Sequence, residues 1–194
     1  RGDLDLLGNL GNAALHLGDD DAQREFYTLM LSTARETGDG MTMLYALQRL
    51  TFSQFVAGQW VALRDACEEA MTLAHSVGQP AFTVAPQAWL ALLAALGGRP
   101  DHADRLAALE EHVRDRPPVG IFAQPVEDLI RWAKGAAALM GGDAPGALHQ
   151  FRQMQRPALT LIAAVDRIEA AVRADDRPLA RQWVEELDAF AAGT

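Results

Sequence analysis

Glycine recurs at a fixed interval along this chain and marks the ends of successive apolar runs. Gly18, Gly58 and Gly98 lie forty residues apart, and each follows a stretch rich in leucine and alanine. A period of about 20 to 50 residues is typical of stacked-repeat proteins, in which one hairpin buries its apolar face only when neighbouring hairpins cover it. The period therefore predicts an array of helical hairpins.

Each interval contains the pattern of two amphipathic helices. The first apolar stripe is formed by Leu4, Leu7, Leu10, Ala14 and Leu17, at three- and four-residue steps. Gly18 ends this helix, and the run Asp19–Asp21 supplies a capping side chain and negative charge to the next. The same pattern predicts hairpins at residues 3–38, 41–78, 82–116, 125–156 and 158–192. Strand-like alternation is absent. We expect an all-α superhelix of about five stacked hairpins, forming one repeat domain of a longer chain.

Two departures from the period are visible near the C-terminal half. The break Arg116–Pro117–Pro118–Val119–Gly120 stretches the interval between Gly98 and Gly142 to 44 residues. The next interval, from Gly142 to the turn at Asp176, shrinks to about 34 residues. The last hairpin is expected to pair a helix at 158–174 with one at 179–191, across a turn that begins at Asp175. The proline-rich break is the place where we expect a bend.

Composition excludes several classes of function. The net charge is −9, and no segment is basic enough to neutralise a row of phosphates, so direct nucleic-acid binding by these residues is not expected. Cys67 is the single cysteine and has no internal disulfide partner, which is typical of a reducing cytoplasm. No apolar run approaches the roughly 20 residues of a membrane span, and no signal peptide is visible. We expect a cytoplasmic protein.

Residues with catalytic or metal-binding chemistry are not grouped in the sequence. The five histidines are scattered without metal-ligand spacing, so no metal and no cofactor is expected in this chain. The run Asp19–Asp21 is interpreted as helix caps rather than a cation site. Paired glutamates such as Glu68–Glu69 point about 100° apart on a helix, which favours a solvated face over acid–base chemistry. Cys67 occupies a core position, so we expect a structural thiol and no enzyme.

Aromatic and polar side chains on the first helices form a candidate binding surface. In a superhelix the first helix of each hairpin lines the inner wall, and an aromatic groove with a few polar groups suits a peptide or a small effector. The candidate groove residues are Asn12, His16, Tyr45, Gln48, Phe52, Phe55 and Trp132. Asp5 is expected on the same wall. The alternative for each residue is that it only packs against the next hairpin.

Several segments resemble tetratricopeptide repeats. In LGNLGNAALHLGDD, residues 7–20, Gly11 takes the small position that lets the second helix approach closely, and Gly18 takes the turn. Gly135 takes the small position in the fourth hairpin, with Phe151 at a packing position of its second helix. The period of forty instead of thirty-four departs from that family, as does Thr51 at the small position of the second hairpin.

The chain also resembles the helical region of large LuxR-type transcriptional regulators of the maltose-regulator class. The resemblance lies in its degenerate repeats of about forty residues, with segments such as GQWVALRDACEEAMTLAHSVGQ and WLALLAALGGRPDHADRLAALEE. The resemblance implies a non-enzymatic sensor module that binds an effector or a protein partner. It would relay binding to ATPase and DNA-binding domains outside this chain, so DNA would be reached only through a domain absent here. Association of several copies of the chain into a homo-oligomer is a further alternative. The alternative is a stand-alone tetratricopeptide scaffold that binds a protein or peptide. Scaffolds of this kind hold a peptide carboxylate with several inward lysines and asparagines, whereas Lys134 is the single lysine of this sequence.

Overall fold

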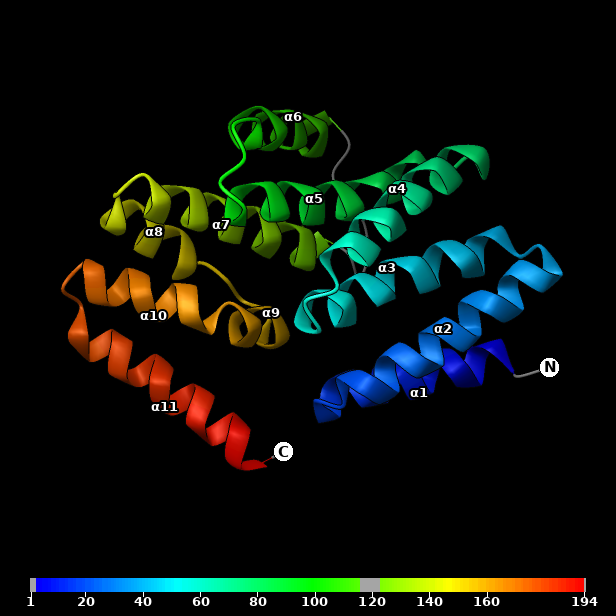
Figure 1. The fold of residues 1–194 in the computed structure, drawn as a ribbon, viewed down its shortest axis with the longest axis horizontal. Helices are drawn as coiled ribbons and strands as arrows, with labels where there is room; N and C mark the ends of the chain where they lie inside the picture. Colours follow the sequence, from blue (N-terminus) through cyan, green and yellow to red (C-terminus); the bar gives the residue numbers. More distant parts are fainter. Residues whose placement is uncertain (1–2, 116–122, 194) are drawn as a thin grey trace. The chain divides into compact units, whose positions relative to one another are not determined.

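The computed structural model describes residues 3–115 and 123–193, and all regular structure in these ranges is helical, as predicted (Figure 1). The α-helices are α1 (Leu4–Leu17), α2 (Asp20–Thr37), α3 (Gly40–Val56), α4 (Trp60–Ser76), α5 (Val84–Leu96), α6 (His102–Asp115), α7 (Ala123–Met140), α8 (Ala144–Phe151), α9 (Pro157–Ile162), α10 (Ala164–Arg173) and α11 (Arg177–Gly193). A 3-10 segment, η1 (Pro80–Thr83), precedes α5. The expected bend at Pro117 and Pro118 lies outside the described residues.

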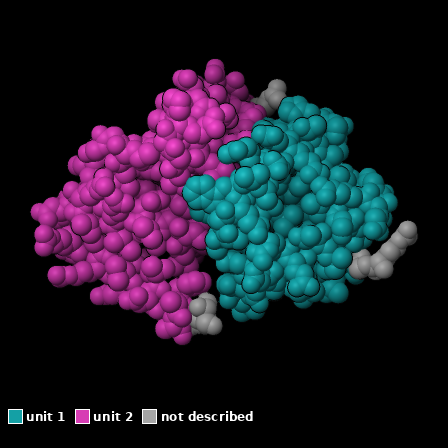
Figure 2. Space-filling model, viewed as in Figure 1, with its two compact units in different colours: residues 1–86 teal, residues 87–194 magenta. Residues whose placement is uncertain are grey.

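Helices that follow one another in the sequence pack together. In the first part of the chain α1 packs on α2, α2 on α3, α3 on α4, and η1 lies against α4. In the second part α7 packs on α8, and α10 contacts α7, α8, α9 and α11. The chain divides into two compact units, unit 1 (residues 1–86) and unit 2 (residues 87–194), which Figure 2 colours separately. The assignment of the whole chain to one repeat domain stays a prediction.

Glycine in the left-handed conformation ends most of these helices. Positive φ angles between 60° and 79° occur at Gly18, Gly38, Gly58, Gly78, Gly98 and Gly142, a conformation that side chains with a Cβ rarely adopt. The residue after each glycine donates its N–H to a carbonyl five residues earlier, as Asp19 does to Ala14 at 2.9 Å. Helix ends thus recur every twenty residues through Gly98, and the forty-residue period is one complete hairpin.

Two hairpins bring their helices together at a glycine. A Cβ on Gly11 would lie 2.6 Å from the ring of Tyr27 in α2, and a Cβ on Gly135 would lie 2.6 Å from the ring of Phe151 in α8. Both aromatic rings are fully buried and stand sixteen residues after their glycine. At both of these glycines, an aromatic ring of the paired helix therefore occupies the space that a side chain would need.

The helix expected at 158–174 is instead divided into α9 and α10 at Ala163. The guanidinium of Arg167 donates to the carbonyl oxygen of Thr160 at 3.0 Å. In a continuous helix that carbonyl would accept from the N–H four residues later. We attribute the break to this competition. The hairpin expected at 125–156 has a shorter second helix, because α8 ends at Phe151, although Met154 remains buried beyond it.

The apolar stripe expected along the first helix is only partly buried. Leu7 and Ala14 belong to the core, but Leu10 is 38% exposed and Leu17 is 73% exposed. Three- and four-residue spacing identifies an apolar face without showing which neighbour covers it. The expected single stripe is therefore two apolar faces of α1, one in the core and one toward solvent.

Asp39 caps α3, and its removal gives a pH-dependent prediction. Its carboxylate accepts from the hydroxyl of Thr42 at 2.7 Å and from the N–H of Thr42 at 3.1 Å, and these bonds lower the pKa of Asp39. A lowered pKa means that the stabilisation is complete above about pH 4 and is lost as the pH falls through the lowered value. Asp39→Ala should cost about 1 kcal/mol at pH 7 and less at pH 2.

Urea denaturation at pH 7 and pH 2 measures this difference. Asp65→Ala serves as the control because it removes an exposed carboxylate from the middle of α4. An Asp39→Ala cost that is the same at both pH values would contradict the assignment of the cap.

Candidate functional site

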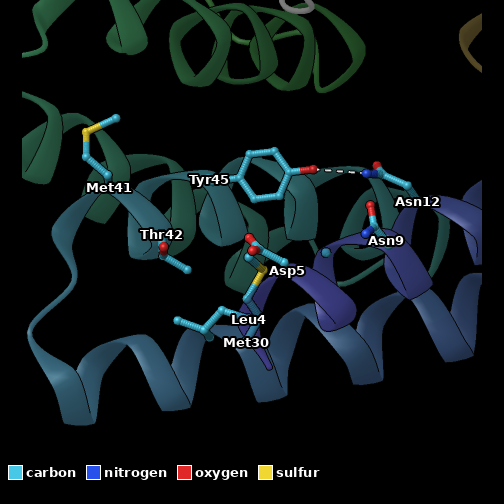
Figure 3. A pocket seen from close by; sticks show the side chains of 9 residues that line it. Leu4, Asp5, Asn9, Asn12, Met30, Met41, Thr42 and Tyr45 are labelled. Atoms are coloured by element: carbon cyan, nitrogen blue, oxygen red, sulfur yellow. Dashed lines mark hydrogen bonds between the residues drawn. The ribbon is translucent and has the colours of Figure 1, made fainter. Parts of the chain in front are cut away.

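A hollow opens between α1 and α3 in unit 1. This open hollow has a volume of about 540 Å³, which is within the range of small-ligand sites. The lining residues are Leu4, Asp5, Gly8, Asn9, Asn12, Met30, Met41, Thr42 and Tyr45. Figure 3 shows these side chains, with the polar groups of α1 on one side and Tyr45 reaching toward Asn12. We call this hollow the α1–α3 groove.

Helical spacing explains how the polar side chains converge. Asp5, Asn9 and Asn12 lie four and three residues apart, so they share one face of α1. Thr42 and Tyr45 lie three apart on α3 and present the opposite wall. At Gly8 the missing side chain leaves space, since a Cβ there would lie 3.6 Å from the methyl group of Met30. Met30 of α2 therefore reaches the floor of the groove.

Hydrogen bonds fix the orientation of the groove's polar groups. The Tyr27 hydroxyl donates to Asn12 Oδ1 at 2.9 Å and also lies 3.3 Å from the carbonyl oxygen of Gly8. Asn12 Nδ2 then donates to the Tyr45 hydroxyl oxygen at 3.1 Å. Because the Asn12 oxygen accepts from Tyr27, its amide is held with the nitrogen toward Tyr45. The second Asn12 N–H remains able to donate to a ligand, and the Tyr45 hydroxyl lies beside it in the lining of the groove.

The two tyrosines differ in acidity. Burial raises the pKa of Tyr27. Burial also acts to raise the pKa of Tyr45, but the Tyr27 hydroxyl and the nearby Arg49 guanidinium outweigh it and lower that pKa. The Arg49 guanidinium carbon lies 5.1 Å from the centre of the Tyr45 ring.

The structure brings together two of the groove residues expected from the sequence. Asn12 and Tyr45 line the α1–α3 groove and are hydrogen-bonded to each other, and Asp5 lies on the same wall. His16 is exposed on α1 outside the residues that line the groove. Gln48 is buried, and its amide donates to the carbonyl oxygen of Phe82 at 2.9 Å. The side chain of Gln48 therefore holds α3 against the segment before α5.

The remaining expected residues lie elsewhere. Phe52 and Phe55 are half-buried on α3. The Phe55 ring stacks on Trp60 across the α3–α4 turn, with centroids 6.3 Å apart and an interplanar angle of 7°. Trp132 belongs to unit 2, where it is 2% exposed and its indole N–H donates to Asp166 at 2.6 Å. The role of these three residues in ligand binding stays a prediction.

Sequence reasoning missed part of the groove. The lining residues that were not predicted to belong to the groove are Leu4, Gly8, Asn9, Met30, Met41 and Thr42. Asn9 could have been found, because it lies three residues before Asn12 on the same face. Met30 could not, since it reaches the groove from a second helix through the gap left by Gly8.

The described part of the chain contains a buried cysteine and no cluster of potential metal ligands. The Cys67 thiol is buried, and burial raises its pKa, which keeps it protonated and unreactive. Across residues 3–115 and 123–193, no three histidine, cysteine or acidic side chains come together as metal ligands. None of the helices in these ranges is both long and apolar enough to cross a bilayer.

Comparisons of the chain with protein-family models, curated proteins and solved structures find no match. The class that the structure itself defines is an all-helical protein whose neighbouring helices pack in pairs.

Proposed function

We propose that this chain is a non-enzymatic sensor and interaction module, the tetratricopeptide-like superhelical region of a LuxR-type transcriptional regulator. In this proposal the α1–α3 groove binds an effector or a protein segment. Binding is relayed to ATPase and DNA-binding domains elsewhere in the parent protein. Stacked hairpins suit such a relay because each contacts only its neighbours, so small rotations add along the array.

The repeated close approach of paired helices supports the tetratricopeptide-like part of this proposal. Gly11 with Tyr27 and Gly135 with Phe151 have the same spacing and the same ring-over-glycine packing. That repetition is expected when one supersecondary unit recurs along a chain.

The oriented donors of the α1–α3 groove carry the binding proposal. Asn12 is fixed by Tyr27 and presents its N–H, with the Tyr45 hydroxyl beside it, to the space between the helices. Met30, Met41 and Leu4 add apolar surface around these donors. A few placed polar groups within an apolar wall are typical of sites that select a small ligand or a peptide.

Tyr45→Phe should weaken ligand binding without unfolding the protein. The change removes only the hydroxyl and keeps the ring, so we expect about fivefold weaker binding, which corresponds to about 1 kcal/mol for one hydrogen bond. A panel of amino acids, sugars and short peptides would first be screened for an increase in melting temperature. Isothermal titration of the best compound then compares wild type, Tyr45→Phe and Asn12→Ala.

The control is Thr72→Val, which removes a hydroxyl from unit 1 outside the groove. Equal affinity of wild type and both groove variants would refute the site. If only the peptides bind, the result favours the scaffold function over the metabolite-sensor function, because extended peptides are the ligands of such adaptors. Absence of binding by every member of the panel would count against the sensor proposal.

A further inference from the structure

The lining of the α1–α3 groove contains a carboxylate and no basic side chain. Asp5 is its acidic residue, and none of the residues that line the groove is lysine, arginine or histidine. The Asp5 carboxylate is exposed, and it forms no hydrogen bond or ion pair with residues 3–115 or 123–193. An unpaired carboxylate in a hollow attracts a cation and repels an anion. The groove therefore favours a ligand with a positively charged group.

An anion finds little to bind it in the same groove. Helix N-termini bind anions through unpaired N–H groups, but the first turns of both helices are capped by acidic side chains. Asp3 accepts from two N–H groups of α1, and Asp39 accepts from one of α3. The Arg49 guanidinium lies over the Tyr45 ring, and Arg49 is not among the lining residues. The charge of the lining is thus set by Asp5.

The internal register indicates that this face of α1 stays open within an array of hairpins. The polar residues that α1 contributes to the groove are Asp5, Asn9 and Asn12. Forty residues later, the equivalent positions of α3 are Tyr45, Arg49 and Phe52. All three are only half-buried, although α3 packs against α2 before it and α4 after it. A helix on either side therefore leaves the equivalent face accessible to a ligand.

The spacing of polar groups along α1 limits the length of the ligand. Asp5 and Asn12 lie seven residues apart, which is about 10 Å along a helix axis. Figure 3 shows Asn9 between them, on the same side of α1. At the far end the amide of Asn12 is held by Tyr27 and presents an N–H to a hydrogen-bond acceptor. Met30 and Met41 supply apolar surface for the part of the ligand between its two polar ends.

We propose that the α1–α3 groove selects small ligands that carry an ammonium group about 10 Å from a hydrogen-bond acceptor. The ammonium group donates to the Asp5 carboxylate, with the amide oxygen of Asn9 as a second acceptor. The acceptor at the other end of the ligand receives the N–H of Asn12. This inference rests on the proposed function, since it names the class of ligand that the same groove binds.

Three compounds that differ in one end group test the preference for a cation. 8-Aminooctanol carries an ammonium and a hydroxyl group, octane-1,8-diol carries two hydroxyl groups, and 8-hydroxyoctanoate carries a carboxylate and a hydroxyl group. Each is titrated into the full chain by isothermal titration calorimetry. We expect the amino alcohol to bind about fivefold more tightly than the diol, as an exposed ion pair allows. The carboxylate should bind more weakly than the diol, and added salt should reduce both differences.

Asp5→Asn should abolish the preference for the amino alcohol and leave the affinity for the diol unchanged, because it removes the charge and keeps the shape of the side chain. Asp65→Asn is the matched control, since it removes an exposed carboxylate of α4 outside the groove. Circular dichroism checks that both variants remain helical. Equal affinity of the wild type for the amino alcohol and the diol, or an unchanged preference in Asp5→Asn, would overturn the proposal. Tighter binding of the carboxylate than of the diol would also overturn it.

Failure of this inference can be distinguished from failure of the proposed function. If the amino alcohol and the diol bind equally and Tyr45→Phe weakens both, the groove is a binding site without a preference for a cation. If neither these compounds nor any member of the screened panel binds, the sensor proposal fails as well. A pentapeptide with one central lysine is titrated in parallel. Its tighter binding would assign the ammonium group to a protein segment and contradict the small ligand.

Discussion

Replacing Asp128 by alanine is expected to lower the free energy of unfolding of unit 2 by about 3 kcal/mol. Asp128 is fully buried on α7. Its carboxylate accepts from the backbone N–H groups of Gln155 at 3.0 Å and Arg156 at 2.7 Å, and from the Arg131 guanidinium at 3.0 Å. One side chain thus ties the α8–α9 connection to α7. Alanine would leave these donors without their acceptor and would open space in the core.

Urea unfolding followed by tryptophan fluorescence measures this effect, because three of the four tryptophans lie in unit 2. Glu127→Gln is a close control, since Glu127 pairs with the same Arg131 at 3.3 Å but is exposed. An exposed pair of this kind contributes less than about 1 kcal/mol. Equal destabilisation by the two substitutions would mean that Asp128 does not hold the connection.

Gly11→Ala is expected to destabilise unit 1 by about 2 kcal/mol, although alanine is the better helix former. The new Cβ would stand 2.6 Å from the Tyr27 ring. That ring is fully buried and its hydroxyl is tied to Asn12, so it has little room to move. Overpacking of this kind costs about 3 kcal/mol, and the helix propensity of alanine offsets about 1 kcal/mol of it.

Gly8→Ala is the matched control on the same helix. Its Cβ would make an ordinary contact, 3.6 Å from the Met30 methyl group, so the substitution should be neutral or stabilise by up to about 1 kcal/mol. Thermal or urea denaturation of the two variants gives the comparison directly. If Gly11→Ala proves as stable as Gly8→Ala, the close packing of α1 on α2 at Gly11 is wrong.

Local sequence signals were sufficient to predict much of the helical pattern. Glycine forces a helix to end where φ is positive, so Gly18, Gly58 and Gly98 identified real boundaries. The division at Ala163 was missed because it depends on the Arg167 guanidinium, which reaches back seven residues to the Thr160 carbonyl oxygen. The spacing of apolar residues does not reveal a side chain that competes for a backbone hydrogen-bond acceptor.

The candidate site shows the same contrast between local and tertiary information. Asn12 and Tyr45 could be placed on first helices by counting, and the structure finds them hydrogen-bonded across the α1–α3 groove. The contribution of Tyr27 could not be foreseen, because its hydroxyl acts from a second helix and orients Asn12 only after folding. Leu10 was expected in the core and is exposed, since periodicity does not separate a face covered within the chain from one left to solvent.

Binding of an effector between α1 and α3 is tested most directly by chemical-shift mapping of the full chain. The compound would be the panel member that raises the melting temperature most, titrated into ¹⁵N-labelled protein. The largest amide shift changes should fall on Asn9 and Asn12 of α1 and on Thr42 and Tyr45 of α3, and Tyr45→Phe should reduce them. Changes centred on Trp132 in unit 2 or on the turn at Trp60, with these four amides unmoved, would contradict the assignment of the groove.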